Sequence, residues 1–218
     1  MTPLLEKIEE ILEMLWISKK EKNKKELSYN VLGVEKNSEE IKELLSKNLI
    51  SITDDNVSLT EDGAIKGENV VRRHRLAEKL LVDVLDLSGS TIHETACKIE
   101  HYLKEGIEDK VCTLLGHPKT CPHGNPIPPG PCCSANLKVG DKYVQPLSQL
   151  KFGQSGKIAY IQGIAQKNLQ SLSSMGILPG VKITVKQTFP SCLFQIGNSE
   201  FAVDKNIADA IFVRVEQD

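Results

Sequence analysis

Two neighbouring stretches of the sequence carry histidine, cysteine and glutamate at the spacing of helical turns. In "IHETACKIEHYL", four such residues stand at i, i+4, i+7 and i+8, namely His93, Cys97, Glu100 and His101. In a helix this spacing places all four side chains along one face. Imidazole, carboxylate and thiolate groups together suit a divalent transition metal such as Fe(II), Mn(II), Co(II), Ni(II) or Zn(II). The stretch therefore predicts a metal-binding helix face.

A second pair, His74 and Glu78, stands four residues apart in the preceding segment. A single pair of this kind is common without a metal. Six ligand-type residues on two adjacent helices favour a metal site, because burying them without a partner would cost free energy. The alternative is an enzyme with Cys97 as nucleophile and His101 as base. The sequence contains neither a phosphate-binding glycine loop nor a G-x-S-x-G motif, so we expect no enzymatic activity.

Four further cysteines lie in and just before the proline-rich stretch "KTCPHGNPIPPGPCC", namely Cys112, Cys121, Cys132 and Cys133. Their spacing, C-x8-C-x10-C-C, matches neither the C-x2-4-C pairs of zinc fingers nor a ferredoxin run. Four thiolates can hold an iron–sulfur cluster or a structural Zn(II), and the adjacent pair favours the cluster because neighbouring side chains point apart. The third interpretation is a linker with reduced thiols, as is usual in the cytosol. All three stay open.

The segment that precedes these residues predicts helices and a hairpin. Apolar side chains recur at helical spacing near the start of the chain, at Leu5, Ile8, Ile11, Leu12, Leu15 and Trp16. A short helix is expected over 26–32, and a second one in "SEEIKELLSKNLI", capped by Asn37 with Glu40. The apolar stripe of the second helix is Ile41, Leu44, Leu45 and Leu49. "LISITDDNVSLT" predicts two short strands around the turn 54–56. Three helices with a small hairpin are typical of a winged helix-turn-helix.

The two ligand-bearing stretches are expected on consecutive helices. The first starts near Asp62 and runs through "VVRRHRLAEKLLVDVL". The next starts at Thr91, which forms a T-x-x-E capping box with Glu94. From about Ser134 the pattern changes to β, and five or so short strands with one inserted helix predict a small SH3-like barrel. Cys192 lies in this β pattern and is expected in its core.

Nearly the whole chain resembles the metal-dependent transcriptional repressors typified by the diphtheria toxin repressor. The likeness is strongest across "RRHRLAEKLLVDVL", "IHETACKIEHYL" and "HPKTCPHGNPIP", and "LSSMGILPGVKITV" resembles a FeoA-type domain. The resemblance implies an α+β multidomain protein. Its parts would be a winged-helix DNA-binding domain (1–62), a helical metal-binding and dimerisation domain (63–118), a Cys/Pro-rich linker (119–136) and a FeoA-like SH3-type domain (137–218).

The same resemblance divides the metal ligands between two sites at the junction of the first two domains. The matching residues are His74, Glu78 and His93 for an ancillary site, and Cys97, Glu100 and His101 for a primary site. The primary site would take one more ligand from the first helix. Glu10 is the best match for that ligand, with Glu9 and Glu13 as close competitors. A carboxylate makes the site harder than a thioether would.

The implied function is transcriptional regulation by a homodimer whose affinity for double-stranded operator DNA depends on Fe(II), Mn(II) or another divalent metal. The residues expected to face DNA are Lys36, Asn37, Ser38 and Lys42. Residues 1–68 nevertheless carry 10 Lys/Arg against 15 Asp/Glu, and the expected recognition helix holds Glu39, Glu40 and Glu43, which repel phosphate. The alternative function is therefore a cytosolic metal or iron–sulfur sensor, or an iron-handling protein, that acts through protein contacts with little DNA binding.

Composition places the chain among soluble globular proteins, with 40% hydrophobic and 26% charged residues. Its apolar runs are far shorter than the roughly 18 residues of a membrane span. The first stretch, "MTPLLEKIEEILEMLW", is charged and lacks a small-residue cleavage site. We expect a cytoplasmic protein without a membrane segment.

Overall fold

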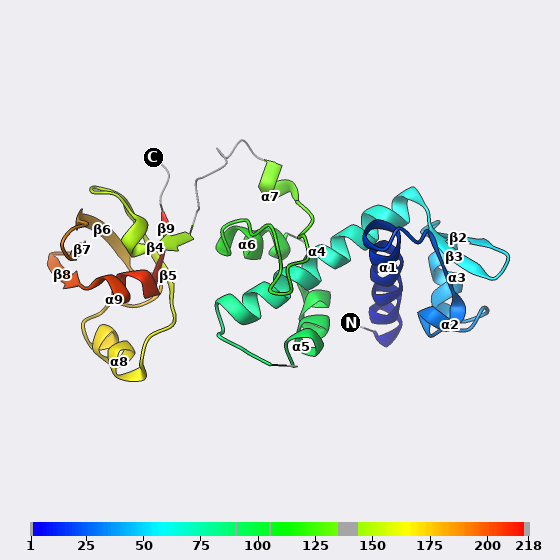
Figure 1. Cartoon of the computed structure of the whole chain (residues 1–218), viewed down its shortest axis with the longest axis horizontal. Helices are drawn as coiled ribbons and strands as arrows, with labels where there is room; N and C mark the ends of the chain where they lie inside the picture. The colour runs from blue at the N-terminus through cyan, green and yellow to red at the C-terminus, as the bar shows by residue number, and fades with distance from the viewer. Residues whose placement is uncertain (1, 90, 105, 135–143, 216–218) are drawn as a thin grey trace. The chain divides into compact units, whose positions relative to one another are not determined.

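The computed structural model describes residues 2–89, 91–104, 106–134 and 144–215, which divide into two compact units (Figure 1). The first unit comprises Met1–Glu78, Gly89–Glu108 and Lys119–Pro129. The second comprises Lys79–Ser88, Asp109–Pro118 and Gly130–Asp218. Each unit combines segments that are distant in the sequence, so neither corresponds to one continuous stretch of chain.

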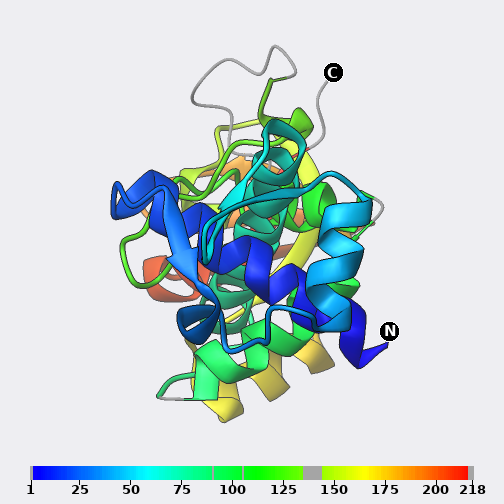
Figure 2. The ribbon, with the colours of Figure 1, turned by 90° about the vertical axis from the view of Figure 1, so that its right-hand side faces the viewer.

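The first unit is built on α1 (Pro3–Glu21), whose apolar face is buried as its periodicity predicts. The core of this unit joins that face to apolar residues of the following strands and helices, including Val57 and Val71. Figures 1 and 2 show α1 beside the first half of α4 (Glu61–Asp83). Gly67 permits this close packing, because a Cβ there would lie 2.7 Å from the carbonyl oxygen of Leu12. The first unit therefore holds α1 directly against the helix that carries His74.

A three-stranded antiparallel sheet with strand order β1-β3-β2 completes this part of the unit. The hairpin of β2 (Ile50–Thr53) and β3 (Asn56–Leu59) is confirmed. The helix expected over 26–32 is wrong in its first half, which forms β1 (Glu26–Ser28) and leaves only a short α2 (Tyr29–Leu32). Pairing of β1 with β3 places Leu27 opposite Val57, and this tertiary contact outweighs local helix propensity.

The next helix, α3 (Glu39–Ser46), begins one residue later than a cap at Asn37 predicts. Ser38, not Asn37, is the N-cap, and its hydroxyl accepts a hydrogen bond from the Ile41 N–H at 3.4 Å. Ile41 and Leu44 are buried as expected. Leu45 was expected in the buried apolar stripe, but its side chain is 43% exposed. The face of α3 that packs against the core is narrower than the stripe of apolar residues in the sequence.

The ligand-bearing helices form as expected, with two corrections. Helix α4 spans Glu61–Asp83 and α5 spans Thr91–Ile99. Thr91 is already helical rather than a cap, and Glu94 instead pairs with Lys98 at 3.1 Å. After Ile99 the chain tightens into the 3-10 helix η1 (Glu100–Tyr102), so Glu100 and His101 do not continue the regular face of α5.

The second unit contains most of α6 (Ile107–Leu114), the short α7 (Pro131–Ser134) and a six-stranded antiparallel sheet of order β4-β9-β5-β6-β7-β8. The strands are β4 (Val144–Pro146), β5 (Ser155–Ile161), β6 (Lys182–Gln187), β7 (Cys192–Ile196), β8 (Ser199–Val203) and β9 (Ile211–Val215). The helices of the sheet region are η2 (Leu147–Gln149), α8 (Gln166–Ser174) and α9 (Lys205–Ala210). Cys192 is buried in the core of this unit, which confirms its predicted place.

The expected boundary between linker and β domain, at 136–137, lies outside the described residues. Among the residues that the structure describes, no helix is both long and apolar enough to span a membrane.

Candidate metal centre

His74 is the centre of the candidate site, and α4 places it in the interior of the first unit. Glu78 follows one helical turn later on the same face and is also buried. Its Oε1 atom lies 3.2 Å from Nε2 of His74. A buried imidazole and a buried carboxylate therefore meet as their spacing predicts.

Helix α5 and the start of η1 bring three more of the expected donors to His74. Nδ1 of His93 lies 3.1 Å from Nε2 of His74, and Sγ of Cys97 lies 3.8 Å from Nδ1 of His74. Oε2 of Glu100 lies 2.5 Å from the same Nδ1 atom. Glu100 is fully buried, whereas the side chain of His93 is 69% exposed. Four of the six ligands expected on these two helices thus surround a fifth, His74.

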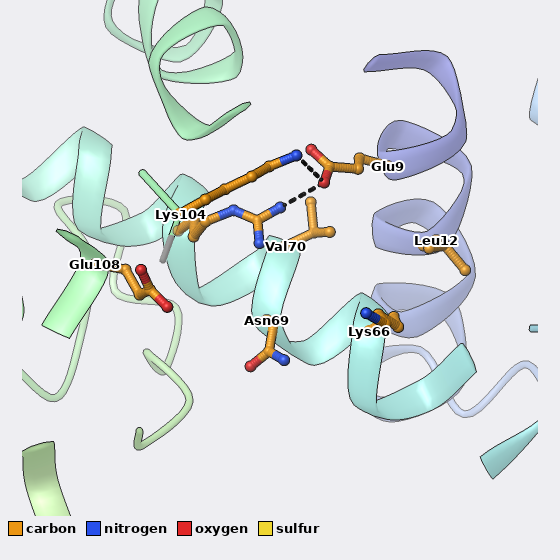
Figure 3. A pocket seen from close by; sticks show the side chains of 8 residues that line it. Glu9, Leu12, Lys66, Asn69, Val70, Lys104 and Glu108 are labelled. Carbon is orange, nitrogen blue, oxygen red and sulfur yellow. Dashed lines mark ion pairs between the residues drawn. The ribbon is translucent and has the colours of Figure 1, made fainter. Parts of the chain in front are cut away.

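His101, the sixth, lies beside them and is held by a carboxylate of α1. Its Nδ1 atom lies 2.6 Å from Oε2 of Glu9. Figure 3 shows the ion pairs that Oε1 of Glu9 makes with Arg73 (3.0 Å) and Lys104 (2.7 Å) at the edge of a pocket. Nε2 of His101 lies 3.8 Å from Oε1 of Glu100. The carboxylate of Glu9 therefore contacts three partners, namely Arg73, Lys104 and His101. Its contact with Nδ1 orients the His101 ring so that Nε2 lies near Glu100.

The structure corrects the ligand expected from α1. Glu10 lies away from the site and pairs with Lys7 at 3.0 Å. Glu13 is the α1 residue that approaches His74, with 4.0 Å between Oε1 and Nδ1. The donor atoms of Glu13, His74 and Glu100 lie within 4.8 Å of one another. Glu9 and Glu13 are four residues apart and share a face of α1, whereas Glu10 is rotated about 100° from Glu9 around the helix axis.

Two more donors come from the loop 119–129. Nδ1 of His123 lies 3.2 Å from Oε1 of Glu78, and the thiol of Cys121 is hydrogen-bonded to Glu78. A backbone hydrogen bond from the Cys121 N–H to the Asn125 carbonyl, 2.9 Å long, reverses the chain and presents both side chains on one side of the turn. No helical or strand period marks this loop, so the sequence patterns did not assign these residues to the His74 region.

The expected set of four cysteines is therefore wrong. Cys121 lies in the first unit with Glu78, because the loop folds back at that point. The remaining three cysteines lie in the second unit around a histidine, and we call this group the thiol cluster: Cys112, His117, Cys132 and Cys133. Burial, and then a hydrogen bond to Asp109, raise the pKa of the Cys132 thiol.

Electrostatics in the metal-free site favour a shared proton on His74. Burial alone would lower the pKa of His74, but hydrogen bonds with Cys97, Glu100 and Glu78 raise it to about 12. Burial opposes ionisation of Glu78 too, yet the hydrogen bond to His74 lowers its pKa to about 2. Burial and then repulsion by Glu100 raise the pKa of Glu13 to about 7. The carboxylates and the thiol around His74 therefore hold it as an imidazolium.

One buried atom tests whether a divalent metal fits these residues. Among the described residues, Oε1 of Glu100 makes no hydrogen bond although it is fully shielded from solvent. An unsatisfied buried carboxylate oxygen costs free energy unless a cation or donor reaches it. Carboxylate oxygens, imidazole nitrogens and one thiolate are all ligands of Fe(II) and Mn(II). The residues present therefore fit a divalent ion.

Comparison with known proteins agrees with this geometry. Residues 60–129 match the family model described as "Iron dependent repressor, metal binding and dimerisation domain", and residues 145–215 match the FeoA domain. The chain therefore carries the metal-binding and dimerisation domain of iron-dependent repressors, followed by a FeoA domain. The matched stretch 60–129 contains every donor around His74 except Glu13, and also holds Cys112, His117, Cys121 and His123.

Named relatives of this chain include the iron-dependent repressor IdeR of Mycobacterium tuberculosis, 33% identical over 147 residues. The chain spans 62% of the length of that relative, and the aligned region covers 62% of this chain. The diphtheria toxin repressor of Corynebacterium diphtheriae is 34% identical over 80 residues, which are 37% of this chain and 35% of that protein. The solved structure of a manganese-dependent transcriptional repressor in complex with manganese is 25% identical, with a TM-score of 0.51, over 96% of this chain and 100% of the other.

Metal binding at the His74 site is expected to release protons. His74 is protonated at pH 7 because its pKa is about 12, and Glu13 is about half protonated because its pKa is about 7. Coordination requires the neutral imidazole and the carboxylate, so metal competes with protons and its affinity should rise with pH between about 6 and 8. Isothermal titration calorimetry with Mn(II) in buffers of different ionisation enthalpy should report a net release of protons, summed over all the Mn(II) bound: one from His74, about half of one from Glu13, and the thiol proton of Cys97.

Two variants sharpen this measurement. Glu13→Gln should lower the number of released protons and flatten the pH dependence below pH 7, because it removes the carboxyl whose pKa is about 7. Glu94→Gln, which alters an exposed carboxylate that pairs with Lys98, should leave the proton count unchanged. Affinity that is independent of pH in the unaltered protein would contradict the shared proton on His74.

Proposed function

We propose that this chain is a cytosolic metal-dependent repressor that binds double-stranded operator DNA as a homodimer, with Fe(II) or Mn(II) as the effector. The relatives named above are repressors rather than enzymes, which supports a regulatory role. The chain spans only 62% of the length of the IdeR relative, so the proposed activity rests on the residues of this chain.

The proposed parts follow the observed elements. Helices α1 to α3 with the small β1-β3-β2 sheet suit a winged helix-turn-helix at 1–62. The segment 63–118 provides the helices for metal binding and dimerisation, and 119–136 is the connecting segment. The six-stranded antiparallel sheet suits the small SH3-like barrel of a FeoA-type domain at 137–218.

The observation that carries the proposal is the meeting of Glu13 with His74 and Glu100. Glu13 belongs to α1, which packs against the small sheet and α3, whereas His74 and Glu100 belong to the helical segment. A ligand that draws these three side chains together therefore acts on the DNA-binding elements and the dimerisation elements at once.

We assign the donors to two adjacent ions. The ancillary set is His74, Glu78 and His93, beside Cys121 and His123. The primary set is Cys97, Glu100 and His101 with Glu13 in place of Glu10. Bound divalent metal would supply positive charge to the buried carboxylates. The chain's own residues do the rest: Glu9 orients His101 through Nδ1, and His74 and Glu13 release their protons.

Regulation then follows from linkage. If one setting of α1 against α4 suits both metal and two operator half-sites, metal and DNA favour the same conformation and each strengthens binding of the other. A tenfold gain in operator affinity needs only about 1.4 kcal/mol of coupling. That is less than half of the roughly 3–5 kcal/mol that removal of one partner from a buried charge pair typically costs.

The proposed DNA-facing residues lie around the start of α3. Lys36, Asn37 and Lys42 are exposed, and Ser38 caps the helix. Lys36 pairs with Asp55 of the hairpin turn at 2.9 Å, so its contact with phosphate requires exchange of that partner. Of the nearby acids, Glu43 is neutralised by Lys47 at 2.8 Å. The remaining acids Glu39 and Glu40 should disfavour nonspecific binding more than binding to a matched sequence.

The experiment that tests the function is selection of a DNA site from a random pool in the presence of Mn(II), followed by fluorescence anisotropy on the selected duplex. Mn(II) should raise affinity at least about tenfold over the same titration with chelator. The logarithm of affinity should also fall linearly with the logarithm of salt concentration, since phosphates are contacted. Equal binding with metal and chelator, or a salt slope near zero, would favour the alternative of a sensor that acts through protein contacts.

A further inference from the structure

The thiol cluster in the second unit is not used by the function proposed above, and its atoms are closely grouped. Sγ of Cys112 lies 3.7 Å from Sγ of Cys133, and Sγ of Cys132 also lies 3.7 Å from Sγ of Cys133. Nδ1 of His117 lies 3.5 Å from the Cys112 sulfur and 3.6 Å from the Cys133 sulfur. All four donor atoms lie within 4.8 Å of one another.

These separations are those of four ligands around a single ion. In tetrahedral zinc sites the Zn–S and Zn–N distances of about 2.3 and 2.05 Å place two sulfurs about 3.8 Å apart and sulfur and nitrogen about 3.6 Å apart. The four separations given above fall within about 0.1 Å of those edges. Thiolates that each bind a different iron of a cluster have no reason to crowd to such distances. The geometry therefore favours one ion over several.

The local backbone is arranged to bring the histidine to the first cysteine. Cys112 lies near the end of α6, and the His117 N–H donates a 2.9 Å hydrogen bond to the Cys112 carbonyl oxygen. His117 has φ +54°, a left-handed backbone conformation that residues other than glycine seldom adopt. This conformation turns its ring back towards Cys112. Positive φ at a residue whose ring joins three thiols is the kind of local strain that marks functional positions.

The other two ligands come from a turn immediately before the end of the described segment 106–134. Pro131 begins α7, and the Cys133 N–H donates a 2.9 Å hydrogen bond to the Gly130 carbonyl oxygen. This turn directs both adjacent thiols of Cys132 and Cys133 towards the other two ligands, contrary to the expectation that neighbouring side chains point apart. The four ligands thus join α6 to α7, which are separated by a proline-rich stretch with little regular structure.

We propose that Cys112, His117, Cys132 and Cys133 bind one Zn(II) in a closed structural site of the Cys3His type. Zn(II) binding displaces the three thiol protons to solvent, and it leaves a centre of net charge −1 with no change in oxidation state. Four protein ligands leave no open position for water or an exchanging effector. Three soft thiolates also separate this site chemically from the carboxylate-rich His74 site, where Fe(II) or Mn(II) is proposed. The zinc has a structural role: it holds α6 and α7 of the second unit together. The site does not act as a metal sensor.

The test is metal analysis of the full chain, purified without oxygen and dialysed against a mild chelator that strips the His74 site. One zinc per chain should remain. It should be lost in Cys112→Ser and in Cys133→Ser, and kept in the matched controls Cys121→Ser and Glu100→Gln. Cys121 was part of the set expected from sequence. The contrast between Cys121→Ser and the other two cysteine variants therefore decides between the two groupings.

Replacement of the metal by Co(II) gives a second readout that does not depend on stability. With Co(II) in excess and no chelator present, the unaltered chain should show the intense absorption of tetrahedral Co(II) with thiolate charge transfer. Cys133→Ser, which binds more weakly, should at saturation show about a third less charge-transfer intensity because two of three thiolates remain. His117→Cys should still bind one ion, now with four thiolates and about a third more intensity. This variant retains the test if the serine variants fail to fold.

Four results would overturn the proposal. The first is zinc retained by folded Cys112→Ser, and the second is zinc lost from folded Cys121→Ser. The third is iron with inorganic sulfide and visible absorbance in the protein as purified, which would assign an iron–sulfur cluster to these thiols. Metal-free protein that binds added zinc no better than Cys112→Ser would equally reject the site.

Discussion

Replacing Glu100 with glutamine is expected to weaken Mn(II) binding by roughly 100-fold or more, a loss of about 2.7 kcal/mol. Glu100 is fully buried, its Oε2 atom lies 2.5 Å from His74, and its Oε1 atom is the unsatisfied acceptor of the site. Glutamine keeps the size and one carbonyl oxygen but removes the charge that attracts a divalent cation. Competition with a chelating dye under anaerobic conditions measures the loss.

The matched control for this change is Glu94→Gln on α5. Glu94 is exposed and pairs with Lys98, so Mn(II) affinity should stay within about twofold of the unaltered protein, as is usual for an exposed ion pair. Circular dichroism of both variants establishes that α5 is intact. Mn(II) affinity of Glu100→Gln within about threefold of the unaltered protein would place the site elsewhere.

The second large effect concerns coupling between metal and DNA rather than metal affinity alone. Glu13→Gln is expected to reduce the Mn(II)-induced gain in operator affinity from at least about tenfold to less than about threefold, a change of at least about 0.7 kcal/mol. Glu13 is the α1 carboxylate near His74 and Glu100, so its charge links α1 to the helical segment. Anisotropy titrations with saturating Mn(II) and with chelator measure both affinities of each variant.

Glu10→Gln is the matched control, because it alters the same helix by the same chemistry three residues away. Glu10 pairs with Lys7 and lies apart from the His74 site, so the Mn(II)-induced gain should be unchanged. The opposite pattern, with coupling lost in Glu10→Gln and kept in Glu13→Gln, would show that Glu10 is the ligand from α1, as the family resemblance favours. Affinity without metal should be similar in all three proteins.

The choice between these two glutamates shows why sequence left the first-helix ligand open. Glu9, Glu10 and Glu13 all lie within one amphipathic helix, and their types are identical. Which of them meets His74 depends on the rotation of α1 about its axis, and close packing of α1 against Gly67 sets that rotation. No local pattern contains this information.

The cysteines illustrate a different limit. Their spacing grouped Cys121 with Cys112, Cys132 and Cys133, because all four stand in one short segment. The fold separates them: a turn closed by Asn125 places Cys121 beside Glu78, and His117 joins the other three. Loops have no period from which side-chain direction can be read, so nearness in sequence was a poor guide to nearness in space.

By itself the sequence determined the ligand types, the helices that carry them and the pairing of His74 with Glu78. These follow from helical periodicity, which is a local property of the chain. Only the tertiary structure decided that Glu13 rather than Glu10 approaches His74, that Cys121 and His123 face Glu78, and that a histidine completes the thiol cluster. Those contacts join segments far apart in the chain, and they depend on how helices rotate and loops reverse when apolar faces pack.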